Sequence, residues 1–203
     1  MTTNVAVIHY SSTGNVHALA QAEVDGAQKA GAETRLLKVA ELAPAEAIEA
    51  NEEWKAHAEA TQDLAEASPD DMLWADAVIF GSPTRYGAMT SQLKQFIDQL
   101  GPLWAEGKLV DKVYSAFTSS QTNHGGQEST ILSINNAFYH WGGVIVGPGY
   151  ADPIQFEHGN PYGASHVSGA GGPGRVETEA ARFQGQRVAQ IATALKRGLR
   201  APD

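Results

Sequence analysis

Strand-like apolar runs alternate with helix-like periods along most of this chain, and this alternation restricts the fold to one class. Five runs predict β-strands: NVAVIHY at 4–10, TRLLKV at 34–39, DAVIFGS at 76–82, KVYSAF at 112–117 and GGVIVG at 142–147. The first, third and fifth runs are almost continuously apolar. Such runs are typical of strands that are buried on both faces of a parallel sheet.

Between these strands, apolar residues recur at helical spacing near 16–27, 93–100, 131–141 and 183–195. Strands that alternate with helices are joined by right-handed crossovers, which predicts an α/β fold with helices on both faces of the sheet. Five strands fit a doubly wound five-stranded parallel sheet of order 2-1-3-4-5. In that order, a ligand binds beyond the carboxyl ends of the strands.

The chain has 203 residues, a length that suits one core, so we expect a single domain spanning 1–203. Two segments exceed the minimal pattern. Residues 43–70 are rich in Ala and Glu and predict a helical insert after the second strand. Residues 148–175 are rich in Gly and Pro and predict a long loop after the fifth strand. Loops of this length in compact domains are commonly functional or disordered.

Charge and composition exclude several classes of function. Acidic residues outnumber basic ones by 23 to 14, giving a net charge of -9 with no basic stripe. This balance argues against nucleic acid and against an anionic membrane surface as partners. The chain has no cysteine, which excludes disulfides, thiolate nucleophiles and iron–sulfur clusters.

The start of the chain and its histidines exclude further classes. MTTNVAVIHY lacks the basic start and long apolar core of a secretion signal, and no run reaches the roughly 18 apolar residues of a membrane span. We therefore expect a cytoplasmic protein. The seven histidines do not have metal-ligand spacing, so no metal site is predicted. His9 and His57 are interpreted as structural or solvated residues.

The loop SSTGNV at 11–16 follows the first strand and opens the first helix. A helix N-terminus presents unpaired N–H groups and a partial positive charge, which suit a phosphate. Ser11, Thr13 and Asn15 add side-chain donors. The loop lacks the glycine-lysine-hydroxyl ending of ATP-binding loops. Its alternative interpretation is a simple helix cap, since Ser, Thr and Asn favour that position.

Two more polar loops follow the third and fourth strands. In GSPTRYGAMTSQLKQF at 81–96, the backbone N–H groups of 84–86 are expected to face a planar heterocycle, with Tyr86 beside it. In TSSQTNHGGQEST at 118–130, paired glycines allow close approach to a ligand. Each loop alone is also consistent with an ordinary turn. Together with the first loop, they converge on one crevice in the predicted topology.

The sequence also contains a literal GxGxxG spacing, GAGGPG at 169–174. No predicted strand runs directly into it, Pro173 interrupts it, and no strand follows the last helix to complete a βαβ unit. A dinucleotide-binding turn needs that context. We therefore interpret this segment as a loop.

A wider set of motifs resembles a known family. SSTGNV, FGSPTRYGAMTSQLKQFIDQ, GPLWAEGKLVDK, GGQESTI, NPYGAS and ARFQGQRVA are similar to segments of the WrbA-type NAD(P)H:quinone oxidoreductases. These are FMN proteins of the flavodoxin-like superfamily. The resemblance extends from about residue 4 to 195 and is interrupted mainly at 43–70. SPTRYGAM and NPYGAS are its most specific parts.

The resemblance implies a set of cofactor-binding residues in the three loops and one helix. These residues are Ser11, Ser12, Thr13, Gly14, Asn15, Val16, Pro83, Thr84, Arg85, Tyr86, Ser119, Ser120, Gln121, Thr122, Asn123, His124, Gly125 and His140. The first loop would hold the FMN phosphate, and the other two the ring and ribityl chain. His140 and Trp104, a predicted loop residue, are the candidate substrate-site residues. Because the flavin supplies the chemistry, no further catalytic residue is required.

The resemblance also implies a function. NAD(P)H would donate a hydride to FMN, which would pass two electrons to a quinone or similar small acceptor in a ping-pong cycle. Family members are typically homotetramers with active sites at subunit contacts. The family commonly places an aromatic residue where Thr13 stands here. This difference leaves open the preference for NADH or NADPH and the identity of the electron donor, and it keeps a flavin-binding regulatory partner as an alternative. A flavodoxin-type electron carrier and a reductase of another acceptor are further alternatives.

Overall fold

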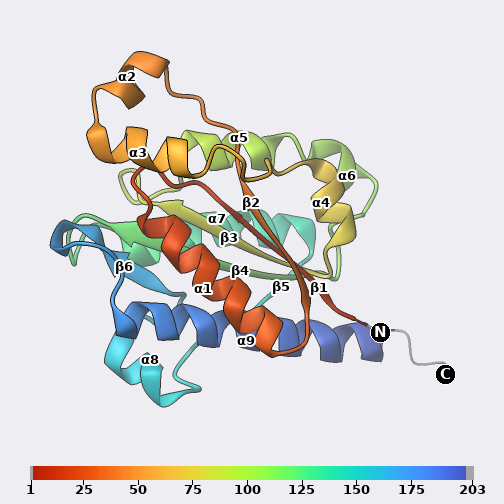
Figure 1. Ribbon diagram of the computed structural model, residues 1–203. Coiled ribbons are helices and arrows are strands. Elements are labelled where there is room, and N and C mark those ends of the chain that lie inside the picture. The colour runs from red at the N-terminus through yellow and green to blue at the C-terminus, as the bar shows by residue number, and fades with distance from the viewer. Residues whose placement is uncertain (1, 200–203) are drawn as a thin grey trace.

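The computed structural model describes residues 2–199, which form a parallel sheet between two layers of helices (Figure 1). The main strands are β1 (Asn4–His9), β2 (Glu33–Lys38), β3 (Ala77–Pro83), β4 (Val113–Ser120) and β5 (Val144–Ile145). They pair in parallel in the order β2-β1-β3-β4-β5. The predicted α/β fold and strand order are therefore confirmed.

Helices connect these strands and cover both faces of the sheet (Figure 1). They are α1 (Asn15–Lys29), α2 (Ala45–Glu49), α3 (Glu52–Ala60), α4 (Pro69–Trp74), α5 (Ser91–Asp98), α6 (Gly101–Ala105), α7 (Gln127–Trp141), α8 (Pro153–His158) and α9 (Arg175–Gly198). None of these described helices is both long and apolar enough to cross a membrane.

Each central strand contributes to two apolar cores, because successive side chains point to opposite faces of the sheet. On one face, Val7 of β1 clusters with Leu19 of α1 and Val188 of α9. On the other face, Ile8 clusters with Phe138 of α7 and with residues of α5. Burial on both faces explains why these strands are continuously apolar in the sequence.

The fifth strand is shorter and less buried than the sequence predicts. The prediction covered 142–147, whereas β5 contains only Val144–Ile145, and Val144 is 37% exposed. Strand β5 cannot begin earlier because Gly142, with a φ of +69°, ends α7. In addition, Gly143 N–H donates to Phe138 O of the same helix. The residues before β5 therefore form a helix cap instead of a strand.

An additional strand, β6 (Ser165–Val167), pairs with the last three residues of β4. It lies within 148–175, which the sequence predicts as a loop. Gly163 lets the chain approach β4 closely, because a Cβ there would lie 2.1 Å from Ala116 O. Three residues of mixed polarity carry no period that would reveal a strand. Pairing with β4 therefore creates this element.

The GAGGPG segment at 169–174 also differs from its prediction. Its first two residues belong to the short 3₁₀ helix Ser168–Ala170 instead of a loop, and this helix separates the segment from β6, which ends at Val167. The segment then leads into α9. In the described part of the chain, no strand follows α9, so no βαβ unit forms around it.

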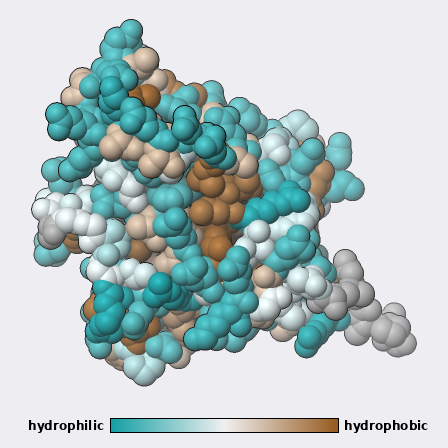
Figure 2. Space-filling view, in the orientation of Figure 1, coloured by the Kyte–Doolittle hydropathy of each residue, from teal (hydrophilic) through white to brown (hydrophobic). Residues whose placement is uncertain are grey.

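The segment 43–70 contains α2, α3 and the start of α4. Asn51 caps α3 by accepting from Trp54 N–H at 3.0 Å, and Ser68 begins α4 within a capping box. Ala67 N–H donates to Lys38 O, which fixes the returning chain beside β2. In the view of Figure 2, most of the surface is hydrophilic, and apolar residues gather in one central strip.

Candidate functional site

The first loop forms an open helix N-terminus at the carboxyl end of β1. Gly14 adopts a φ of +92°, a left-handed conformation that favours glycine, and α1 begins at Asn15. Ser11 Oγ accepts a hydrogen bond from Gly14 N–H at 3.1 Å, which shapes the turn. In the described part of the chain, no side chain caps the first turn of α1, so its N–H groups remain available to an anion.

This helix N-terminus opens into a polar cavity of about 490 Å³. Loops after β1, β3, β4 and β6 line the cavity, which therefore lies beyond the carboxyl ends of the strands. One residue of α3, Glu53, also faces it. The lining residues are Ser12, Thr13, Asn15, Glu53, Pro83, Thr84, Arg85, Ser119, Ser120, Gln121, Thr122, Gly125, Ser168 and Gly169.

Most of the predicted cofactor residues line this one cavity. Seven of them do not. Val16 is buried in the core against α1 and α9, and Ser11 lines a neighbouring cavity. Tyr86 has a φ of +54° and is fully exposed. The others outside the lining are Gly14, Asn123, His124 and His140.

The turn after β3 uses its backbone differently from the prediction. Thr84 N–H donates to Ser119 O at 2.8 Å, and Arg85 N–H donates to Ala88 O at 2.7 Å. Two of the three N–H groups expected to face a heterocycle are therefore already bonded within the protein. The Thr84 side chain is held as well, because Thr130 Oγ1 donates to Thr84 Oγ1 at 2.8 Å. The turn after β3 therefore presents a rigid edge to the main cavity.

The loop after β4 is compact and fixed by its own hydrogen bonds. Ser120 Oγ donates to Thr122 O at 2.7 Å and accepts from Gln127 Nε2 at 2.9 Å. Gly125 has no room for a side chain, since a Cβ would lie 2.9 Å from Ser120 Cβ. The glycine therefore permits this tight wall of the cavity.

His140 and Trp104 lie together in a second, more apolar cavity of about 630 Å³. Trp104 is in helix α6 and not in a loop as predicted, and it is 56% exposed. Its Nε1–H donates to His140 O at 3.0 Å. The second cavity shares no lining residue with the first, although Ala88 and Met89 connect it to the turn after β3.

Three histidines form a cluster behind the first loop, with neighbouring rings tilted against each other. The ring centroids of His9 and His17 are 5.1 Å apart, and those of His17 and His57 are 5.3 Å apart. Burial, followed by repulsion from His17, lowers the pKa of His9 to about 3. Burial, followed by the charges of His17 and Lys38, lowers the pKa of His57 to about 4. Burial also lowers the pKa of His17, so all three imidazoles are neutral at pH 7.

The sequence did not predict this histidine cluster, nor did it predict that α3 and the segment after β6 line the main cavity. His9 and His17 flank the first loop in the sequence, and this spacing is only a weak indication that their side chains meet. The positions of His57 and Glu53 depend on how the insert folds, and that of Gly169 depends on β6. Among residues 2–199, no group of three or more His, Cys, Asp or Glu side chains is arranged to bind a metal ion.

Comparisons with known proteins agree with this geometry. The family model for NADPH-dependent FMN reductase matches residues 3–156. A Deinococcus radiodurans protein called NAD(P)H dehydrogenase (quinone) is 46% identical over 92% of this chain and 93% of its own. A Sinorhizobium fredii protein of the same name is 46% identical over 94% of this chain and 98% of its own.

Solved structures add two similarities. A flavodoxin, WrbA-like protein from Agrobacterium tumefaciens matches with a TM-score of 0.69 and 26% identity, over 95% of this chain and 99% of that one. An archaeal flavodoxin matches with a TM-score of 0.62 and 17% identity, over 94% and 99% of the two chains, which shows a common fold. The chain belongs to the NADPH-dependent FMN reductase family.

Proposed function

We propose that this protein is an FMN-dependent NAD(P)H:quinone oxidoreductase. The observation that carries the proposal is the polar cavity beyond the carboxyl ends of β1, β3 and β4, which opens at the uncapped N-terminus of α1. Relatives that share 46% of their residues with this chain bear the name NAD(P)H dehydrogenase (quinone). Their full-length similarity supports the same activity here.

The residues present fit a flavin mononucleotide. The first turn of α1 would bind the phosphate through its backbone N–H groups and the side chains of Ser12, Thr13 and Asn15. The turn at Thr84 and the loop at Ser119–Gly125 would hold the ring and the ribityl chain. When bound, the flavin supplies two-electron chemistry, accepting a hydride from NAD(P)H and reducing a quinone in a ping-pong cycle.

The second cavity is the proposed binding site of the substrates. Its apolar lining and the exposed indole of Trp104 suit a flat quinone or nicotinamide. His140 lies beside that indole and would reach a flavin from a neighbouring subunit. We propose accordingly a homotetramer, built from single-domain chains in the cytoplasm, with active sites at subunit contacts.

The test combines flavin binding with turnover. The purified protein is mixed with FMN, and binding is followed by quenching of the flavin fluorescence. NADH or NADPH oxidation is then measured with and without benzoquinone. We expect FMN to bind and the oxidation to depend on the quinone. Absence of flavin binding would overturn the proposal, and binding without pyridine-nucleotide oxidation would indicate an electron carrier or a regulatory partner.

A further inference from the structure

The phosphate end of the cavity has no lysine or arginine in its own loop, residues 11–16. The titratable groups behind that loop are the imidazoles of His9 from β1, His17 from α1 and His57 from α3. On the proposed function, the phosphate of FMN binds in front of these three side chains.

The hydrogen bonds within the histidine cluster fix the tautomers of His9 and His17. Leu37 O can only accept, so the 2.9 Å contact requires that His9 Nδ1 carries the proton. Neutral His9 then accepts at Nε2, and His17 Nδ1 must donate to it at 2.9 Å. This leaves Nε2 of His17 with a free lone pair, which is a basic position directly behind the loop.

His57 provides a second basic position against the loop itself. Its Nδ1 lies 3.5 Å from where a Cβ on Gly14 would stand, so the imidazole packs on the loop backbone. Within residues 2–199, no hydrogen bond involves a ring nitrogen of His57. Glu53, one turn earlier on α3, faces the main cavity. Helix α3 therefore lies across the phosphate loop.

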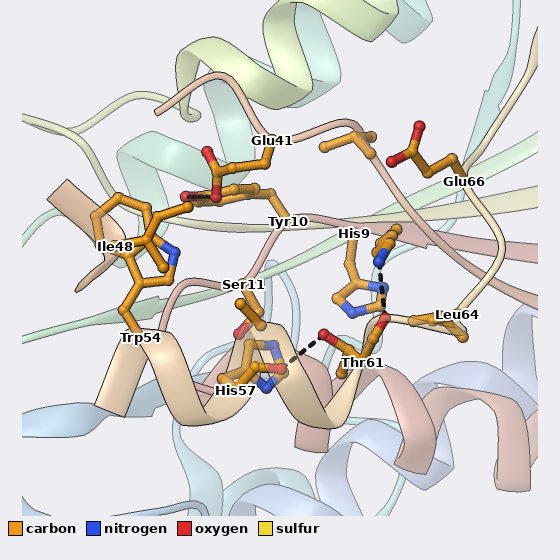
Figure 3. Close-up of a pocket in the computed structure, with 13 residues that line it drawn as sticks. His9, Tyr10, Ser11, Glu41, Ile48, Trp54, His57, Thr61, Leu64 and Glu66 are labelled. Carbon is orange, nitrogen blue, oxygen red and sulfur yellow. Dashed lines mark hydrogen bonds between the residues drawn. The ribbon is translucent and has the colours of Figure 1, made fainter. Parts of the chain in front are cut away.

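Burial first, and then the positive charges around the histidine cluster, lower the imidazole pKa values and so favour neutral imidazoles in the absence of a ligand. Lys38 of β2 donates to Thr61 O at 2.7 Å and lies close enough to oppose protonation of His9 and His57. The positive end of α1 opposes protonation of His17 in its first turn. In the opposite sense, the carboxylates of Glu41 and Glu66, which would favour protonation, line the adjoining cavity of about 120 Å³ with His9 and His57 (Figure 3). Arg85 lies across the main cavity.

A phosphate dianion at the N-terminus of α1 would reverse this local balance, because it places negative charge next to both basic positions. We infer that the His17–His57 pair takes up one proton when the phosphate of FMN binds. The added proton resides either on His17 Nε2 or on the ring nitrogen of His57 that carries no proton in the neutral imidazole. This uptake makes the preference of the chain for FMN over riboflavin, which lacks the phosphate, increase as the pH falls.

The linkage between proton uptake and FMN binding sets how strongly the affinity depends on pH. Binding that takes up one proton strengthens by at most about tenfold for each pH unit. The free phosphate itself titrates near pH 6, about the second pKa of a phosphate ester, and below that value the two effects cancel. We therefore expect the ratio of FMN to riboflavin affinity to rise roughly tenfold from pH 8 to pH 6.5.

The experiment measures the dissociation constants of FMN and riboflavin by flavin fluorescence from pH 6 to pH 8.5. It uses the wild-type chain, His57→Gln and His17→Asn. The asparagine amide keeps a donor toward His9 Nε2, so this variant removes the titration with little change in packing. Lys55→Gln is the control, because it removes one charge from the exposed side of the same helix. Proton resonances of the imidazoles, followed with and without FMN, provide a second readout.

The inference predicts that the ratio rises in the wild type and in Lys55→Gln, and that it stays flat or falls toward low pH in the histidine variant that removes the proton-binding imidazole. One imidazole should also titrate at higher pH when FMN is present. A wild-type ratio that does not rise, or a rise that survives both histidine substitutions, would overturn the inference and leave FMN binding intact. Failure of all variants and the wild type to bind FMN would instead reject the proposed function.

Discussion

At the scale of single residues, Glu23 is a carboxyl group in an apolar setting. It is fully buried on α1, beside Gly185 of α9, and neither of its carboxylate oxygens has a hydrogen-bond partner among residues 2–199. Burial raises the pKa of Glu23 well above 4.5. A carboxyl without a partner is more stable in its neutral form under such conditions.

We therefore expect the free energy of unfolding to fall as the pH rises from about 4.5 toward the raised pKa. The folded state binds the proton more tightly than the unfolded state, so each pH unit in that window costs up to about 1.4 kcal/mol. Glu23→Gln removes this titration. Urea unfolding at several pH values should show the variant gaining on the wild type as pH increases. Parallel pH profiles for the two proteins would contradict the expectation.

Asn15 tests the phosphate end of the cavity. Its side chain lines the cavity and bonds through Nδ2 to Thr13 Oγ1 at 3.2 Å. Asn15→Ala is expected to weaken FMN binding roughly tenfold, the effect of losing one hydrogen bond to a charged group. Riboflavin serves as the control ligand, and its affinity should not change. An equal loss for both flavins would mean that Asn15 supports the loop instead of binding the phosphate.

Single residues also show what the sequence can and cannot predict about the site. Thr13, Thr84 and Ser119 follow strands that the sequence identifies, so their convergence is predictable from topology. Glu53 and His57 lie on a helix whose orientation depends on the packing of the whole insert. No local pattern encodes that orientation, so their position beside the phosphate loop could not be predicted.

At the scale of elements, helices α1 and α9 pack backbone to backbone. A Cβ on Gly26 of α1 would lie 1.9 Å from Arg182 O, and a Cβ on Gly185 of α9 would lie 2.1 Å from Glu23 O. No side chain larger than hydrogen fits at either position. The two glycines therefore set the distance between these helices on one face of the sheet.

Gly26→Ala and Gly185→Ala should each destabilise the protein by about 1–3 kcal/mol or more, because overpacking forces the helices apart. Gly198→Ala is the matched control at the end of α9, where no atom of residues 2–199 lies within 4 Å of the added atom. It should be neutral or slightly stabilising. Chemical unfolding of the three variants measures the difference. Equal stability of all three would show that the interface tolerates an added methyl group.

The elements differ in how predictable they are. Strands β1 and β3 are buried on both faces, and the apolar residues at their centres, VAVI in β1 and AVIF in β3, reflect that environment. Strand β5 contains two residues, and β6 contains three residues whose partner is remote in the sequence. The first kind of strand is recognisable from local composition. The second kind exists because β4 extends beyond β5 and its open edge accepts another backbone.

At the scale of the whole molecule, the proposed tetramer has a specific expectation. Four chains of 21.5 kDa would give a particle of about 86 kDa in light scattering. Trp104→Ser should reduce that mass, since it removes an exposed apolar side chain from the rim of the second cavity. Leu73→Ser, which removes an exposed leucine from α4, is the control and should leave the mass unchanged. A monomer in the wild type would reject the proposal.

The contact between α1 and α9 has a consequence for synthesis on the ribosome. Helix α1 leaves the ribosome before α9, and the face that carries Glu23 and Gly26 packs against residues 175–198. Until that segment has been translated, the nascent chain exposes part of an apolar surface, and such surfaces recruit chaperones or cause aggregation. Closure of this face thus has to wait until α9 has been translated, which happens long after the phosphate loop has been made.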